Sequence, residues 1–167
     1  MTIVDKAYTF ATAAHAAVGQ KRKYDGEDYI VHPIRVANIV KQHGGTDSMI
    51  AAAYLHDVVE DTNVTMDTIT GMFGSVVASL VDDLTDVSCS YDGNRATRKS
   101  IDAQHTADAS ADAQFIKCAD IIDNSWDIRD KDPSFWKVYQ REMSLLLDEM
   151  VRVKGTDIYN EARASVE

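Results

Sequence analysis

The residues best suited to chemistry in this sequence lie in the segment AAAYLHDVVEDT, residues 51–62. His56 and Asp57 are adjacent there, and Glu60 and Asp61 follow one helical turn later. On a helix with about 3.6 residues per turn, His56 and Glu60 share one face and the two aspartates share the adjoining one. An imidazole and a neighbouring carboxylate can both bind a divalent ion. The segment is therefore either a solvated helix end or a metal site with its acid and base beside it.

Two further residues could complete such a site. His32 directly precedes Pro33, at the expected start of a helix. Asp120 occurs in the otherwise apolar segment IKCADIIDN, where burial of a carboxylate without a partner is costly and metal coordination would offset the cost. Each has an ordinary alternative: His32 could cap or hydrogen-bond a helix end, and Asp120 could pair with Lys117 three residues earlier. The ordered combination of these residues with residues 56–61 favours a metal site.

The elements that must position these residues are helices. The chain has only 2 prolines and 8 glycines, and its apolar residues recur at helical spacing almost throughout, so we predict an all-α fold. Pro33 suits the first turn of a helix, and Gly44 and Gly45 suit its end. The helices that we expect cover about residues 7–18, 33–43, 47–56, 65–72, 76–84, 96–105, 111–129 and 135–153, with a final short helix after residue 155.

Composition excludes several classes of protein. At 167 residues the chain suits a single domain, residues 1–167, with no repeat or linker. Its net charge of -10 disfavours a nucleic-acid partner, which would need a basic face. No segment approaches the roughly 20 apolar residues of a membrane span, so we expect a cytoplasmic protein without membrane contact. Cys89 and Cys118 fit no zinc or disulfide spacing, which indicates reduced thiols.

Two features leave alternatives open. The basic run Lys21 to Lys23 could hold a small anionic ligand or could simply be solvated. Near the apolar helix expected at residues 135–153, Trp126 and Trp136 could pack within the chain or across a homo-oligomer interface. We favour the core position for both tryptophans.

Four segments in order resemble motifs of one known family, and together they cover about Gly19 to Asn124. GQKRKYDGEDYIVHP is similar to G-Q-x-R-K followed by G-x-P-Y-I-x-H-P, and AAAYLHDVVEDT is similar to A-A-x-L-H-D-x-x-E-D-T. FGSVVASLVDDLTDV resembles F-G-x-x-V-A-x-L-V-x-x-L-T, and IKCADIIDN resembles I-K-x-A-D-x-x-x-N. The family is that of the HD-domain hydrolases of RelA/SpoT-type alarmone enzymes, in particular the single-domain small alarmone hydrolases.

The resemblance implies a helical HD domain with a metal site between helices. It implies a divalent metal, usually manganese (Mn²⁺), and a small-molecule nucleotide substrate that lies against a few basic and amide side chains. At the matching positions, the metal ligands would be His32, His56, Asp57 and Asp120. Glu60 and Asp61 would position and activate the attacking water, and Arg22, Lys23 and Asn124 would contact the nucleotide.

The reaction that the resemblance implies is removal of the 3′-pyrophosphate of ppGpp or pppGpp, which leaves GDP or GTP. The residues suit this chemistry, since phosphate ester hydrolysis needs a Lewis acid, a base for the water proton and positive charge near the phosphoryl oxygens. The sequence does not assign the base to Glu60 or to Asp61.

The sequence departs from the family pattern at three positions. Asp28 replaces the proline before Tyr-Ile, Ile121 replaces the arginine after the aspartate of the last motif, and the histidine before Gly-Gln is displaced to His15. The first alternative is therefore an HD phosphohydrolase for another nucleotide: a dNTP, a nucleoside monophosphate or NADPH. A second alternative is a module that binds a nucleotide or protein without catalysis, but such a module would ordinarily have lost a ligand or the Glu-Asp pair.

Overall fold

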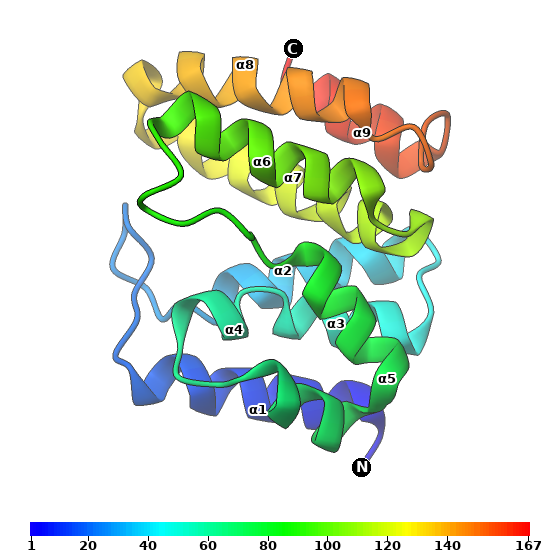
Figure 1. Ribbon diagram of the computed structural model, residues 1–167. Helices are drawn as coiled ribbons and strands as arrows, with labels where there is room; N and C mark the ends of the chain where they lie inside the picture. The colour runs from blue at the N-terminus through cyan, green and yellow to red at the C-terminus, as the bar shows by residue number, and fades with distance from the viewer. The chain divides into compact units, whose positions relative to one another are not determined.

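The computed structural model describes all 167 residues and contains nine helices, α1 to α9 (Figure 1). The only β-type pairing is an isolated antiparallel bridge between Lys21 and Asp28. The expected all-α fold is therefore confirmed. The helices form two compact units, Met1–Thr85 and Asp86–Glu167, and each is described by itself. A single domain over residues 1–167 stays a prediction. No helix has both the length and the apolar character that a membrane span requires.

The first unit is organised around its third helix. Its elements are α1 (Ile3–Ala17), α2 (Val31–Gln42), α3 (Asp47–Leu55), α4 (Val58–Asp61) and α5 (Met66–Leu84). Helix α3 packs against α1, α2 and α5. Three consecutive alanines of α3, Ala51 to Ala53, are all 0% exposed, and their small side chains let three neighbouring helices approach one backbone closely.

The segment that carries His56 and Asp57 is not one continuous helix, which corrects the expectation of a helix running through to His56. Helix α3 ends at Leu55 and α4 begins at Val58, with the two residues in the turn between them. Asp57 has a backbone φ of -102° and ψ of -2°, away from ideal helical values. The His56 ring nitrogen Nδ1 bonds the carbonyl oxygen of Ala53 at 2.7 Å, which stabilises this turn. His56 and Asp57 therefore project from a turn and not from one helix face.

Helix α5 contains the interruption that the sequence predicts at Gly74. This residue has a φ of +82°, in the left-handed region that glycine adopts without steric cost. The two predicted helices, 65–72 and 76–84, thus meet at a kink inside α5.

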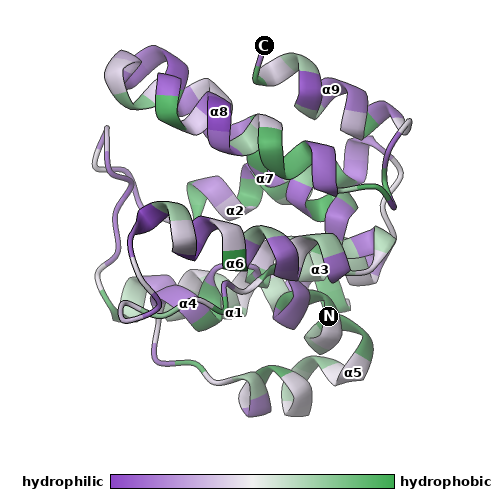
Figure 2. Ribbon diagram, turned by 45° about the horizontal axis from the view of Figure 1, so that its top comes forward, coloured by the Kyte–Doolittle hydropathy of each residue, from purple (hydrophilic) through white to green (hydrophobic).

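The second unit is built on α7. Its elements are α6 (Arg95–Asp108), α7 (Ala111–Lys131), α8 (Pro133–Glu149) and α9 (Asp157–Ser165). Helix α7 packs against α6, α8 and α9, and α6 also packs against α8. Purple and green segments alternate along α8 in Figure 2, as expected for a helix with one buried face. Helix α8 ends at Glu149, before the expected Val153.

The aromatic and thiol side chains of this unit differ in burial. The core position expected for Trp126 is wrong, because its side chain on α7 is 73% exposed. Trp136 is half-buried, with the Arg129 guanidinium 4.7 Å from its ring centroid. Both cysteines are free, Cys89 at the surface and Cys118 in the core, where burial raises the thiol pKa to about 12.

Candidate metal centre and active site

Three of the predicted metal ligands meet within the first unit. His32 comes from the first turn of α2, and His56 and Asp57 come from the turn between α3 and α4. One candidate ligand atom from each lies within 4.8 Å of the other two. The Nε2 atoms of His32 and His56 face the same oxygen, Oδ2 of Asp57, at 3.7 and 3.0 Å. The fold therefore brings together residues that are 24 positions apart in the sequence.

The donor set fits a divalent cation. His56 must donate from Nδ1, because its partner there is a carbonyl oxygen, so in the neutral ring the lone pair is on Nε2. That lone pair faces a carboxylate oxygen 3.0 Å away. The two electron-rich atoms repel each other unless a cation or a proton lies between them. His32 and His56 are only 1% and 3% exposed. Two buried imidazoles converging on one carboxylate are typical of a site for a divalent transition metal.

Tyr29 supports this cluster, and the sequence reasoning did not single it out. Its hydroxyl donates a 2.6 Å hydrogen bond to Oδ2 of Asp57. Its ring lies beside that of His32, with centroids 6.0 Å apart, and the Arg22 guanidinium lies 5.7 Å from its centroid. Tyr29 therefore connects the basic loop with the candidate metal ligands. The available signal was the position of Tyr29 three residues before His32, within the segment GQKRKYDGEDYIVHP.

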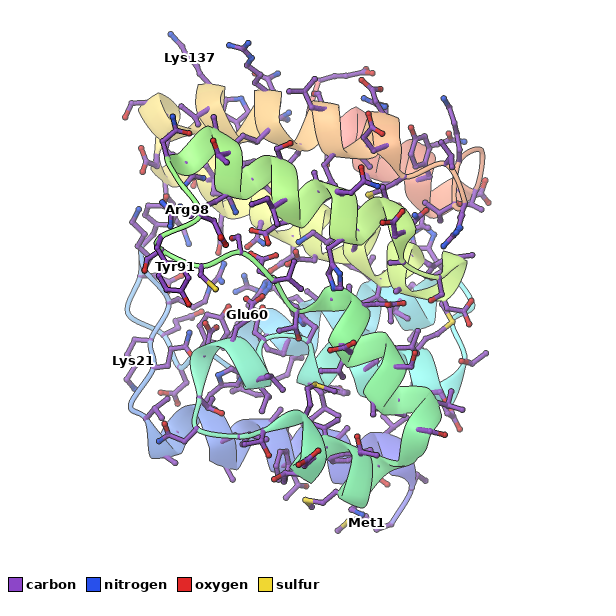
Figure 3. The ribbon with its side chains drawn as sticks, viewed as in Figure 1. Met1, Lys21, Glu60, Tyr91, Arg98 and Lys137 are labelled. Carbon is purple, nitrogen blue, oxygen red and sulfur yellow. The ribbon has the colours of Figure 1, made fainter.

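Glu60 and Asp61, the predicted pair for handling water, are both exposed on α4, and Figure 3 labels Glu60 there. The Asp61 oxygen Oδ2 accepts a 3.0 Å hydrogen bond from Nε2 of Gln20. Partial desolvation and the nearby Asp57 carboxylate raise the pKa of Asp61, and the bond from Gln20 opposes that rise. Asp61 thus has a defined partner and an electrostatic link to Asp57, a candidate metal ligand.

The predicted basic run forms a loop between α1 and α2. Lys21 extends from this loop in Figure 3 and pairs with Asp28, and the same two residues make the backbone bridge. The backbone N–H of Arg22 donates to the Glu27 carbonyl at 2.8 Å, and the Lys23 ammonium lies 5.1 Å from the Tyr24 ring centroid. Asp28, which departs from the family pattern, therefore lies opposite Lys21 across this loop.

The remaining predicted site residues, Asp120 and Asn124, lie on α7 in the second unit. Asp120 is 7% exposed as a residue, and its carboxylate is held at both oxygens. Lys117 donates to Oδ2 at 2.8 Å, which confirms the ion pair considered from the sequence, and Asn124 donates from its amide nitrogen to Oδ1 at 2.8 Å. Asn124 therefore orients Asp120, a contact that the sequence did not predict.

The surroundings of Lys117 explain its charge state. Burial opposes the charged ammonium, but the Asp120 and Asp86 carboxylates outweigh that effect and raise the pKa of Lys117.

Next to Asp120, Ile121 is 0% exposed. The residue that replaces the family arginine is thus part of the apolar core of this unit.

Residues 7–119 match the sequence model of the HD domain, and this chain belongs to the HD domain family. The match includes His32, His56 and Asp57 and ends one residue before Asp120.

The chain is also similar to proteins described as 3′-pyrophosphohydrolases. The chain is 36% identical to the guanosine-3′,5′-bis(diphosphate) 3′-pyrophosphohydrolase MESH1 of Xenopus tropicalis, over 80% of this chain and 74% of that protein. It is also 44% identical to a probable guanosine-3′,5′-bis(diphosphate) 3′-pyrophosphohydrolase of Synechocystis, over 52% of this chain. The matched region is only 11% of the length of the Synechocystis protein.

A solved structure agrees with these relatives. It belongs to a metazoan ortholog of SpoT described as hydrolysing ppGpp, and it is 25% identical to this chain. The two superimpose with a TM-score of 0.80, over 99% of this chain and 94% of the other.

Proposed function

We propose that this protein is a metal-dependent hydrolase that removes the 3′-pyrophosphate of ppGpp or pppGpp. The observation that carries the proposal is the convergence of two buried imidazole nitrogens on one oxygen of Asp57. Relatives described as 3′-pyrophosphohydrolases of guanosine-3′,5′-bis(diphosphate) match most of the chain and support the substrate. The products would be pyrophosphate and GDP or GTP.

His32, His56 and Asp57 would hold the metal ion, and we propose Asp120 as the fourth ligand because it matches the family motif. Lys117 and Asn124 hold this carboxylate in a fixed orientation, and its two oxygens retain further lone pairs for a metal ion. We propose Mn²⁺ as the ion, since the resemblance to the alarmone hydrolases implies it and carboxylate ligands suit it. The ion, when bound, would lower the pKa of the attacking water and polarise the phosphoryl group.

The other predicted site residues would act on water and substrate. Glu60 and Asp61 would orient the water and accept its proton. The raised pKa of Asp61 makes its carboxylate a stronger base, which suits this role. Arg22 and Lys23 would attract the phosphates to the loop beside Tyr29. The amide oxygen of Asn124 is the group that we assign to the nucleotide, because its nitrogen bonds Asp120.

One observation favours a second candidate, an HD phosphohydrolase for a dNTP, a nucleoside monophosphate or NADPH. Ile121 is buried where the alarmone hydrolase motif has an arginine, so that cation is absent from this position. Such an enzyme would retain the same metal ligands and differ only in the nucleotide that it binds.

An activity panel separates the two candidates. Purified protein with Mn²⁺ is expected to release pyrophosphate from ppGpp and to leave dATP, 5′-nucleoside monophosphates and NADPH intact. Ion chromatography distinguishes released pyrophosphate from monophosphate. Turnover of dATP or NADPH without ppGpp hydrolysis would reject the alarmone assignment, and release of phosphate from a 5′-monophosphate would indicate a monophosphatase.

We also propose that the enzyme works in the cytoplasm, where its nucleotide substrate would be found. We retain a homo-oligomer as a proposal, supported by the exposed indole of Trp126.

The variant Tyr29→Phe tests whether the Tyr29 hydroxyl supports the proposed metal ligand Asp57. The variant loses the hydroxyl that donates to Asp57 but retains the ring between His32 and Arg22. Loss of a hydrogen bond to a metal ligand typically lowers metal affinity by about 10- to 100-fold, and we expect a change at the lower end. Calorimetric titration with Mn²⁺ measures it, with Tyr54→Phe on α3 as the control. Equal Mn²⁺ affinity in Tyr29→Phe and the wild type would remove this role from Tyr29.

A further inference from the structure

A chain of hydrogen bonds runs from a buried histidine to the proposed catalytic carboxylate. Nδ1 of His15, in the last turn of α1, lies 2.8 Å from Oε1 of Gln20. The other end of the same amide donates from Nε2 to Oδ2 of Asp61 at 3.0 Å. Asp61 follows Gln20 by 41 positions, so only the tertiary fold brings the three residues together.

The backbone holds Gln20 firmly in this position. Gly19 has a φ of +64°, and this left-handed turn ends α1 and directs the chain away from it. The N–H of Gln20 donates to the His15 carbonyl at 3.2 Å, and its own carbonyl accepts from the Tyr29 N–H at 3.3 Å. Both backbone polar groups of Gln20 are thus hydrogen-bonded, which fixes the position of the backbone atoms that carry its side-chain amide.

The direction of the hydrogen bonds follows from chemistry. An ionised carboxylate only accepts, so the amide nitrogen of Gln20 must face Asp61 and the amide oxygen must face His15. His15 must therefore carry its proton on Nδ1. Its Nε2 then needs no acceptor, which agrees with the burial of this atom without a hydrogen-bond partner. The ring is 1% exposed and lies against Tyr29, with centroids 4.8 Å apart.

We propose that His15 and Gln20 form a positioning relay that holds the Asp61 carboxylate in its working orientation. The relay deepens the proposed function and rests on it, because Asp61 is one of the two residues assigned to the attacking water. Neither His15 nor Gln20 makes a hydrogen bond of this relay to a proposed metal ligand. Loss of the relay would therefore displace Asp61 without removing a ligand. The histidine displaced from the family pattern would thus act through Gln20.

Kinetics of four variants test the relay. Gln20→Leu and His15→Leu remove it, whereas His15→Asn places an amide N–H near the position of Nδ1. A misplaced catalytic group typically costs about 100-fold in rate, so we expect a fall of that size in kcat for ppGpp in the two leucine variants, with KM unchanged. Mn²⁺ affinity should stay at the wild-type value, and His15→Asn should recover most of kcat. Thr12→Val, on α1, is the matched control.

Nuclear magnetic resonance tests the relay without substrate. The ¹⁵N spectrum of the wild-type His15 ring should show the Nδ1–H tautomer. The Asp61 carboxyl ¹³C resonance should move in both leucine variants and stay near its wild-type position in His15→Asn. These measurements also apply if ppGpp is not hydrolysed, in which case the proposed function fails and the relay is judged by the spectra alone.

Three results would overturn the relay. The first is an unchanged kcat in Gln20→Leu, and the second is an Nε2–H tautomer in the wild type. The third is a loss of Mn²⁺ affinity in Gln20→Leu as large as that in Asp57→Ala, since the site as a whole would then have collapsed. Circular dichroism of each variant confirms that it has folded.

Discussion

Replacing Asp57 by alanine is expected to abolish pyrophosphate release from ppGpp. Oδ2 of Asp57 is the atom that Nε2 of both His32 and His56 face, and it also accepts from Tyr29. Removing it takes away the only negative charge in the three-residue cluster and one of the three proposed ligands there. Partners of metal ligands typically contribute about 10- to 100-fold, so loss of the ligand itself should lower kcat/KM by more than roughly 1,000-fold. Steady-state assays and Mn²⁺ calorimetry measure the two losses.

Two controls sharpen this experiment. Asp67→Ala removes an exposed aspartate of α5 in the same unit and should leave both activity and Mn²⁺ affinity unchanged. Asp57→Asn retains the shape of the side chain but not its charge, and should bind Mn²⁺ less tightly than the wild type. Substantial pyrophosphate release by Asp57→Ala would reject the site. Anomalous scattering from manganese-soaked crystals with no peak near His56 would reject the metal mechanism as a whole.

Lys117→Met is expected to produce the largest loss of stability among the site variants. The ammonium of Lys117 lies 2.8 Å from Asp120, whose side chain is 9% exposed, and it also balances the Asp86 carboxylate. Methionine fills a similar volume but removes the positive charge beside both carboxylates. Breaking a buried pair by removing one partner typically costs about 3–5 kcal/mol, and we expect about 3 kcal/mol because Lys117 is partly accessible. Urea denaturation of metal-free protein measures the free energy of unfolding.

A second ion pair on the same helix provides the matched control. Lys131 lies 3.2 Å from Asp127 at a more accessible position, with 31% of the lysine side chain exposed. The Lys131 side chain is more exposed than that of Lys117, 31% against 23%, so solvent screens its pair more strongly and Lys131→Met should cost less than Lys117→Met. Equal losses in the two variants would show that the effect comes from lysine on α7 in general and not from the charges around Asp120.

The helices could be predicted from sequence because the signals that specify them are local. Apolar residues at helical spacing, Pro33 at a helix start and Gly74 at a break all act within a few neighbouring residues. The errors arise where distant contacts compete with local preference. Trp126 is apolar and was expected in the core, but it lies near the C-terminal end of α7, where Arg129 and Asp130 are exposed as well.

Of the candidate site, too, only some features could be predicted from the sequence. Motif order was sufficient to propose His32, His56, Asp57 and Asp120 as ligands, since those residue types in that order are specific. The contact between Asn124 and Asp120 was not predicted, although it is local, because an asparagine at that spacing can equally face a ligand. The turn between α3 and α4 was also missed, since its residues are compatible with a continuous helix.

By itself, the sequence determined that the chain is helical, that its polar residues gather in a few motifs, and that those motifs suit a metal-dependent hydrolase. Residue type and short-range spacing are sufficient for these conclusions. Only the tertiary structure decided that His32 faces the same oxygen as His56, that Tyr29 bonds this oxygen, and that Gln20 connects His15 with Asp61. Such contacts depend on the packing of α1, α2, α3 and α4, which brings atoms from distant parts of the chain close together. Local sequence preference does not specify these distances.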